Sequence, residues 1–195
     1  MKIIGITGFI ASGKTSVSAM FNVCGVHSFD ADRVVHELYG EEDVLLKVQN
    51  IVPDSVVNGE IDRAVLGKVA LKDKVIMKAL EEFVHPMVRE RMNEFLDRCR
   101  ASNCEMVLLD IPLLFEGGLN EICDYVLYTK CSDEDLRTRY LARDNSNLEK
   151  LEKILIRQNN YDKENLADYI INTSNDVDVT KAEVAQIIKD IKQNA

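Results

Sequence analysis

The sequence is poor in the residues and segments that mark several classes of protein. Its 195 residues include only 3 prolines and 9 glycines, while 46% are hydrophobic and 29% are charged, which excludes a disordered or collagen-like chain. No segment approaches the roughly 20 apolar residues of a membrane span. The first residues also lack the longer apolar run and cleavage site of a secretory signal. We therefore expect a globular, cytoplasmic protein that is not bound to a membrane.

The chain also lacks an excess of basic residues and any paired pattern of cysteines. It has 24 Lys and Arg against 33 Asp and Glu, a net charge of -9, which argues against a duplex nucleic-acid binder because neutralising phosphates takes clustered basic residues. An anionic ligand must therefore be bound by a local group of donors and not by a broad basic surface. The five cysteines show neither CxxC pairs nor zinc-site spacing, which predicts reduced, buried thiols: Cys24, Cys99, Cys104, Cys123 and Cys131.

Short apolar runs alternate with segments of helical periodicity. The runs predict strands at residues 2–7, 26–29, 105–109, 124–129 and 169–172. This alternation predicts an α/β protein with three layers, α/β/α, around a five-stranded parallel sheet. Some 70 residues separate the second and third strands, too many for one crossover helix, so we expect a helical side domain there.

Within that side domain, we expect helices at residues 33–50, 62–72 and 73–99. Pro86 lies inside the last of these and predicts a kink or a break at His85-Pro86. Ser132, before three acidic residues, is typical of a helix start. The pairs Ser146 with Glu149 and Thr180 with Glu183 each fit a capping box.

Residues 8–15 read GFIASGKT and match GxxxxGK[ST] between a predicted strand and a predicted helix. In such a loop, backbone N–H groups and the helix N-terminus hold phosphate without a basic surface. Lys14 is expected to reach the β- and γ-phosphates, and the Thr15 hydroxyl to coordinate Mg²⁺. The alternative is a glycine-rich turn with an exposed lysine. We predict a nucleoside triphosphate site.

Acidic and basic side chains suited to phosphoryl transfer occur elsewhere in the sequence. Asp30 and Asp32 follow the second strand, and Asp110 ends an apolar strand in a Walker B arrangement, so all three are expected at the edge where open α/β sheets bind ligands. Arg139 and Arg143 are four residues apart on a predicted helix and should share one face. From there they could close over the phosphates.

Each of these residues also has a simpler interpretation. An acid at a strand end is often a helix cap or a solvated turn. The two arginines could form surface ion pairs with Asp135 and Asp144. His85, taken alone, is more often structural than catalytic.

Taken together, the motifs resemble those of the dephospho-CoA kinase family, P-loop enzymes that use ATP to phosphorylate the ribose 3′-hydroxyl of dephospho-CoA. The resemblance spans nearly the whole chain. Its marks are TGFIASGKTSV at 7–17, FDAD at 29–32, IDRAVL at 61–66, HP at 85–86, DIPLLFE at 110–116, RYLARD at 139–144, Gln158, Lys163 and ADYIIN at 167–172.

The resemblance implies a role for each part of the chain. Residues 1–32 and 100–195 would form the nucleotide-binding core of one P-loop kinase domain, 33–99 a helical subdomain that binds the acceptor, and 136–162 the lid. Asp32 would act as the positioning base toward the 3′-hydroxyl, with Lys14, Arg139 and Arg143 also catalytic, since charge neutralisation dominates phosphoryl transfer.

Binding roles follow in the same way. ATP would be held by Gly8, Ala11, Ser12, Gly13, Lys14, Thr15, Ser16 and Arg143, and Mg²⁺ by Thr15 and Asp110. The acceptor would be held by Asp30, Asp32, Arg63, His85, Pro86 and Leu114. The expected partners are ATP and dephospho-CoA, with no nucleic acid, and we expect a monomer or a weak homo-oligomer.

The loop departs from the family pattern GGIGSGKS, because Phe9 and Ala11 replace two glycines. A Cβ at Ala11 is awkward at positive φ, so either the backbone there is ordinary or nucleotide affinity is somewhat reduced. Thr15-Ser16 keeps a hydroxyl for Mg²⁺. Two other functions remain open: a kinase for another small metabolite or nucleoside, and a nucleotide-dependent switch, although the chain has no NKxD-type guanine-reading motif.

Overall fold

The structure is a computed structural model that describes residues 1–143, 146–159 and 161–193. The chain divides into two compact units. Unit 1 comprises Met1–Asp30 and Leu96–Ala195, and unit 2 is Ala31–Phe95. Each unit is described below by itself.

Unit 1 is built on a parallel sheet in the order β2-β5-β1-β6-β7. The three-layer α/β/α class predicted from the sequence is confirmed. Because all five strands run the same way, their carboxyl ends meet at one edge of the sheet. The strands are β1 (Lys2–Gly8), β2 (His27–Asp30), β5 (Met106–Asp110), β6 (Tyr125–Lys130) and β7 (Tyr169–Asn172).

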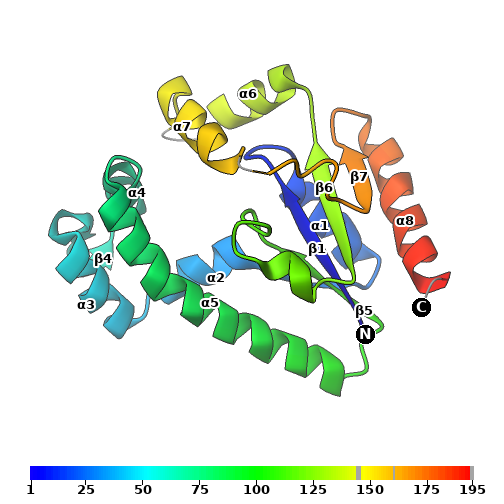
Figure 1. Ribbon diagram of the computed structural model, residues 1–195, viewed down its shortest axis with the longest axis horizontal. Coiled ribbons are helices and arrows are strands. Elements are labelled where there is room, and N and C mark those ends of the chain that lie inside the picture. Colours follow the sequence, from blue (N-terminus) through cyan, green and yellow to red (C-terminus); the bar gives the residue numbers. More distant parts are fainter. Residues whose placement is uncertain (144–145, 160, 194–195) are drawn as a thin grey trace. The chain divides into compact units, whose positions relative to one another are not determined.

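The strands carry apolar side chains on both faces of the sheet, so both faces must be covered by other elements. On one face α1 (Lys14–Val23) and α8 (Val177–Gln193) pack together on the strands (Figure 1), with Ile4, Phe21 and Ile191 fully buried there. On the other face, Leu114 and Cys123 fill the space beside Gly5. Unit 1 also contains η2 (Leu119–Ile122), α6 (Asp133–Leu141) and α7 (Leu148–Gln158).

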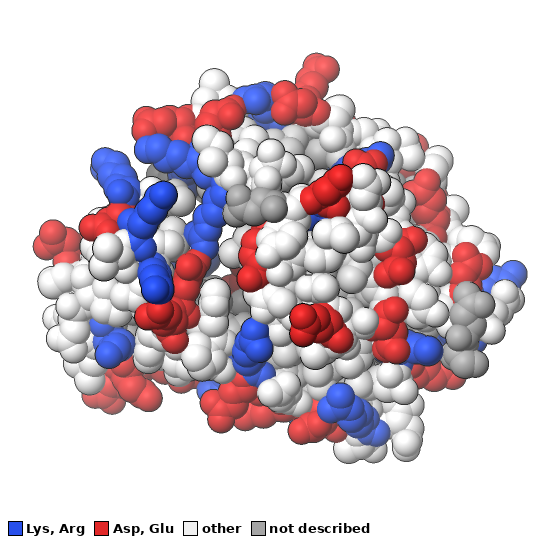
Figure 2. All heavy atoms as spheres, viewed as in Figure 1, with Lys and Arg blue, Asp and Glu red and all other residues white. Residues whose placement is uncertain are grey.

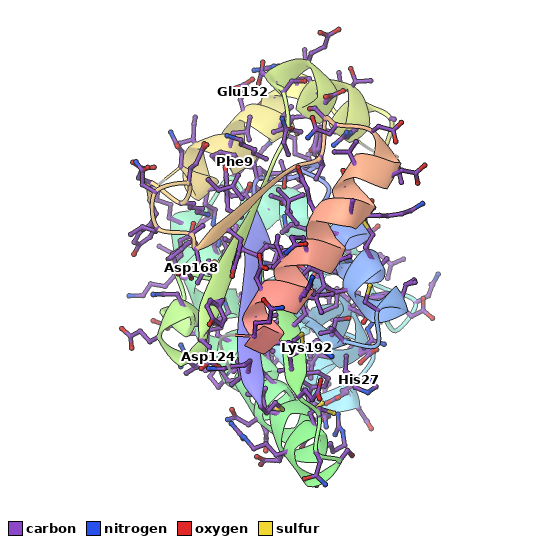
Figure 3. The ribbon with its side chains drawn as sticks, turned by 90° about the vertical axis from the view of Figure 1, so that its right-hand side faces the viewer. Phe9, His27, Asp124, Glu152, Asp168 and Lys192 are labelled. Carbon is purple, nitrogen blue, oxygen red and sulfur yellow. The ribbon has the colours of Figure 1, made fainter. Side chains whose placement is uncertain are left out.

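Two aspartates fix the register at the amino ends of the strands. The Asp124 carboxylate accepts a hydrogen bond of 2.7 Å from the Ile3 amide, and the Asp168 carboxylate accepts one of 2.7 Å from the Val126 amide. Both side chains are labelled in Figure 3. These hydrogen bonds tie β6 to β1 and β7 to β6, and so fix how the carboxyl-terminal ends of the three strands align at the opposite edge of the sheet.

Unit 2 is mostly helical. It contains α2 (Ala31–Leu38), α3 (Glu42–Ile51), η1 (Pro53–Ser55), the hairpin strands β3 (Val56–Val57) and β4 (Glu60–Ile61), α4 (Arg63–Ala70) and most of α5 (Lys74–Ala101). The single helix expected at 33–50 is two helices, because the chain turns at Gly40, whose amide bonds to the Glu37 carbonyl. A kink or a break was expected at His85-Pro86, and the break is wrong, since α5 continues through Pro86.

The helix caps are partly as predicted. Ser132 caps α6 by accepting from the Asp135 amide. However, α7 is capped by Asn147 rather than Ser146, and Thr180 lies inside α8, where its hydroxyl bonds to the Asp176 carbonyl. A capping-box pattern one residue out of place, or three residues inside a helix, looks the same in sequence as a true one.

The five cysteines are free, but they are not uniformly buried. Cys99 is buried, whereas Cys24 is exposed and the other three are partly exposed. Acidic and basic side chains are interspersed over the face drawn in Figure 2. Within the described residues, no helix has the length and apolarity needed to cross a membrane.

Candidate active site

The loop that joins β1 to α1 has a backbone suited to a phosphate cradle. Gly13 caps α1 at φ 87° and contributes no side chain, so the amides of the first helical turn have no side-chain cap. A Cβ on Gly8 would lie 2.6 Å from the Ser12 hydroxyl and collide with Thr129. Both glycines are therefore required by the loop's close packing as well as by its shape.

The side chains of the loop divide into a buried anchor and an outward-facing set. Ser12 is 1% exposed, and its hydroxyl lies 2.7 Å from that of Thr129 at the end of β6. Lys14 folds back along the loop, with Nζ donating to the carbonyl of Gly8 at 2.9 Å and to that of Phe9 at 3.2 Å. Thr15 and Ser16 are exposed in the first turn of α1. The ammonium group thus already lies at the loop that would hold phosphate.

Ala11 takes a left-handed backbone conformation at φ 60°, so the backbone at this departure from the family pattern is not ordinary. That conformation costs a residue with a Cβ roughly 1–2 kcal/mol. The Ala11 side chain is, however, buried against Leu136, Tyr140 and Leu151 of α6 and α7. Burial of a methyl group recovers about 0.8 kcal/mol, so packing offsets much of the strain.

Phe9 belongs to the same contact between loop and helices. It packs at the margin of that apolar cluster and lies beside α7 in Figure 3. The Gln158 side chain at the end of α7 accepts a hydrogen bond of 2.9 Å from the Ile10 amide. The two residues that replace glycine therefore join the phosphate loop to α6 and α7.

Two acidic residues end neighbouring strands of the sheet. Asp110 of β5 pairs in register with Asp30 of β2 on one side and with Ile6 of β1 on the other. Asp110 is only 7% exposed, and one of its carboxylate oxygens accepts a 2.8 Å hydrogen bond from Ser18 of α1. This bond fixes the carboxylate beneath the helix that follows the phosphate loop.

The donor set fits Mg²⁺. Thr15 and Ser18 are three residues apart on α1, so they share a face of the helix, and Ser18 holds the Asp110 carboxylate. A hydroxyl and a carboxylate are the hard oxygen ligands that Mg²⁺ takes, with its other positions filled by water and substrate phosphate. This arrangement matches a nucleotide-bound magnesium ion.

Arg139 on α6 is partly buried and is bound to Thr173, the residue after β7. Its Nη1 donates to the Thr173 hydroxyl at 2.9 Å and its Nη2 to the Thr173 carbonyl at 2.7 Å. The alternative interpretation paired Arg139 with Asp135, but the Asp135 carboxylate accepts hydrogen bonds from the hydroxyls of Ser132 and Ser174. Those two hydroxyls lower the pKa of Asp135.

Arg143 does not share a helix face with Arg139, contrary to the sequence prediction. Helix α6 ends at Leu141, and Arg143 lies beyond it, exposed, with its amide bonded to the Tyr140 carbonyl at 3.1 Å. Its expected partner Asp144 lies outside the described residues. The helical pattern at 139–143 failed because helix ends have no sharp signal in sequence.

The residues predicted to bind the acceptor lie on several elements. Asp30 ends β2 in unit 1, whereas Asp32 is exposed in the first turn of α2 in unit 2. Arg63 begins α4 of unit 2 directly after its cap Asp62. Leu114 is fully buried beside Gly5 in unit 1, so it supports the loop after β5 from within the core.

His85 and Pro86 lie in the middle of α5, within unit 2. The pKa of His85 is lowered, first by partial burial and then by the positive charge of Arg89. In the same unit, burial raises the pKa of Tyr39 while Arg63 opposes that shift. Unit 2 therefore places positive charge near two side chains that can hydrogen-bond.

Two residues that anchor the phosphate loop did not stand out in the sequence as functional. Thr129 lies near the end of β6 and Thr173 directly follows β7, and only the fold brings both threonines to Ser12. Lys163, one of the marks of the family resemblance, is 2% exposed and pairs with Glu116 at 2.7 Å, beside a ring stack of Phe115 on Tyr161. The only sequence signal for the two threonines was their position at the end of an apolar strand.

Comparison with known proteins gives a consistent result. The sequence model of the family described as dephospho-CoA kinase matches residues 2–179. The chain is 38% identical to the dephospho-CoA kinase of Rhodopseudomonas palustris (strain HaA2), over 96% of this chain and 94% of that one. It is 41% identical to the dephospho-CoA kinase of Rhizobium etli, over 97% and 93%.

Solved structures agree. TT1252 from Thermus thermophilus superposes with a TM-score of 0.80 at 28% identity, covering 99% of this chain and 97% of that one. Dephospho-CoA kinase from Campylobacter jejuni gives a TM-score of 0.70 at 27% identity, with both chains fully covered. A shikimate kinase from Bacteroides thetaiotaomicron, at 15% identity and a TM-score of 0.52, shares the fold alone. With its phosphate loop, its acid-bearing strand ends and a family match along nearly its full length, the chain belongs to the dephospho-CoA kinase family.

Proposed function

We propose that this protein transfers the γ-phosphoryl group of ATP to the ribose 3′-hydroxyl of dephospho-CoA and so forms coenzyme A. The observation that carries the proposal is the family match over residues 2–179, which includes the phosphate loop and both acid-bearing strand ends. The register of Asp30 with Asp110, next to the strand that leads into the loop, supports a transfer reaction at this edge of the sheet.

On the donor side, the loop amides and Lys14 bind and orient the phosphates of ATP, with Gly8, Ala11, Ser12, Gly13, Thr15 and Ser16 forming the cradle. Arg139 and Arg143 neutralise charge on the phosphoryl group in transfer, the main requirement of a loose transition state. Mg²⁺, held by Thr15 and Asp110 when bound, would neutralise the charge of the phosphate oxygens.

On the acceptor side, Asp32 orients the ribose 3′-hydroxyl and accepts its proton at a carboxylate oxygen. Asp30 helps to position the acceptor, while Arg63, His85 and Pro86 of unit 2 contact the rest of it. We leave Leu114 out of the direct contacts because it is fully buried. Water exclusion by the lid, residues 136–162, protects ATP from hydrolysis.

The remaining expectations concern the protein as a whole. We propose that it acts in the cytoplasm as a monomer or a weak homo-oligomer, without a nucleic-acid partner. The phosphate loop, Asp110 and Arg139 all belong to unit 1 of a single chain, so no second copy is needed to supply these donor-side residues. Gel filtration across a range of concentrations tests the oligomeric state.

The function is tested by a panel of hydroxyl acceptors assayed with ATP and Mg²⁺. We expect ADP release to be stimulated by dephospho-CoA, with the product phosphorylated at the ribose 3′ position. Asp32→Asn should lower kcat severely, while Lys181→Gln, a surface control on α8 paired with Asp178, should not. Stimulation by a nucleoside or sugar alone would assign another acceptor, and nucleotide binding without any acceptor effect would support a switch.

A further inference from the structure

Thr173 lies between a lid arginine and the phosphate loop. Its hydroxyl is 2.9 Å from Nη1 of Arg139 and 2.9 Å from the carbonyl oxygen of Ser12. The Lys130 carbonyl lies farther from the same hydroxyl, at 3.3 Å. One side chain thus connects α6 to the loop at the residue that precedes the glycine cap of α1.

The direction of these hydrogen bonds follows from the chemistry of the groups. A guanidinium only donates and a carbonyl only accepts. The Thr173 hydroxyl must therefore accept from Arg139. It donates its single proton to the carbonyl of Ser12, which is the nearer of the two carbonyls. This use of the hydroxyl leaves Arg139 held at a defined place beside the loop.

The backbone around Thr173 is itself held firmly. Its amide donates to the Lys130 carbonyl at 2.8 Å, which continues the pairing of β7 with β6. On the loop side, a Cβ added to Gly13 would meet the Thr173 side chain at 2.9 Å. Thr173 therefore has little freedom to shift relative to the loop.

The next residue anchors the same helix. The Ser174 hydroxyl accepts from the Ser132 amide at 2.8 Å and bonds to the Asp135 carboxylate. Asp135 lies four residues, about one turn, before Arg139 on α6. The two residues after β7 thus hold α6 at successive turns, Ser174 at its start and Thr173 at its arginine.

We propose that Thr173 is a positioning residue for phosphoryl transfer, which holds the Arg139 guanidinium beside the phosphate loop. The proposal rests on the proposed function and adds to it a residue that acts through Arg139. A free arginine side chain must lose much rotamer freedom when it meets its ligand. A guanidinium that is already restrained loses less, which favours the transition state.

The test compares Thr173→Val, which is close to isosteric and lacks the hydroxyl, with Thr173→Ser, which keeps it. We expect Thr173→Val to lower kcat roughly tenfold, the range for a hydrogen bond to a charged group, with KM for ATP changed less than about twofold. Thr173→Ser should retain most of kcat. Ser174→Ala serves as a control for general loosening of α6 and should have a smaller effect.

A double-mutant cycle asks whether Thr173 acts through Arg139. In an Arg139→Ala background, Thr173→Val should cause little further loss of kcat. An equal loss in both backgrounds would overturn the proposal, as would a rise in KM for ATP without a fall in kcat. Thermal unfolding of each variant identifies any loss of kcat that is caused by misfolding. If Thr173→Val misfolds, the kcat of Thr173→Ser decides whether the hydroxyl is needed, and a large fall in that kcat would overturn the proposal. If the wild-type protein fails to phosphorylate dephospho-CoA, the proposed function fails instead.

Discussion

The two units hold their proposed functional residues in different ways. In unit 1, the phosphate loop makes short hydrogen bonds with Thr129, Gln158 and Thr173, and the Ser18 hydroxyl donates to the Asp110 carboxylate. In unit 2, the side chains of Arg63 and His85 make no hydrogen bond to the residues that the structure describes, and the ion pairs lie at the surface, such as Arg91 with Glu41. Hydrogen bonds therefore hold the residues of the phosphate site, whereas the side chains of Arg63 and His85 are not held in this way.

This contrast suits the two substrates. Phosphate groups are small and need donors at fixed places, because misplacement directly weakens the charge neutralisation on which transfer depends. A long acceptor can be held by several weak contacts, each of modest energy. Substitutions at the hydrogen-bonded residues of unit 1 should therefore affect kcat and folding. Substitutions at Arg63 and His85 of unit 2 should affect mainly KM.

The largest expected effect is in unit 1. Lys14→Ala should lower kcat about 10³-fold, because it removes the charge aimed at the transferring phosphates. Steady-state assays with ATP and dephospho-CoA measure the loss. Lys192→Gln, which removes a surface partner of Glu105 at 2.7 Å, is the matched control and should leave kcat unchanged. Equal activity in both variants would contradict the assigned role of Lys14.

The second prediction concerns the two left-handed residues of the loop. Gly13→Ala should destabilise the protein by about 2–4 kcal/mol, since it adds backbone strain and a contact of 2.9 Å with Thr173. Ala11→Gly should change stability by less than about 1 kcal/mol, because relief of strain is offset by lost methyl packing. Urea unfolding of both variants measures the difference. A larger loss for Ala11→Gly than for Gly13→Ala would show that the loop depends on apolar packing more than on its backbone shape.

The third prediction tests unit 2. Arg63→Ala should raise KM for dephospho-CoA roughly tenfold, the effect of losing one charged contact of about 1.4 kcal/mol, with kcat little changed. Lys78→Ala, which loses only a surface pair with Glu82 in the same unit, should leave KM unchanged. A fall in kcat at constant KM would place Arg63 in the transfer step and remove the contrast between the units.

The smallest expected effect concerns the pKa of His85. The pKa of His85 lies below its ordinary value, because burial and Arg89 both disfavour the charged form. The unfolded chain therefore binds more protons just below pH 6.5, and this residue's contribution to stability falls as the pH is lowered through that range. NMR titration of His85 measures the shift. Arg89→Gln should raise the pKa toward its ordinary value, and an unchanged pKa would leave burial as its sole cause.

Particular residues show how far sequence reasoning extends. The five strands of the parallel sheet were predicted within about one residue, because apolar runs between polar turns are strong local signals, and β7 at 169–172 was predicted at its observed bounds. The two-residue hairpin strands β3 and β4 were not predicted. The same reasoning merged α2 with α3 and placed the start of α7 at Ser146 instead of Asn147. Helix ends depend on small differences between adjacent capping residues, which tertiary contacts decide.

The candidate site divides in the same way. Lys14, Thr15 and Asp110 were predicted as site residues because a motif or a strand end marks them, while Thr173 and Thr129 were not, because a single threonine has no distinctive pattern. The positive φ of Ala11 was raised in the sequence only as a possibility. Its compensating contacts come from α6 and α7, more than a hundred positions later in the chain.

By itself, the sequence determined the alternation of the five sheet strands with helices, the presence of a phosphate loop and the resemblance to the family. These features depend on periodicity and on short motifs, where local geometry is decisive. Only the tertiary structure decided which strand ends lie side by side and that Thr173 holds Arg139 beside Ser12. Such contacts join residues up to 161 positions apart, and they form because a parallel sheet brings the ends of distant strands to one edge.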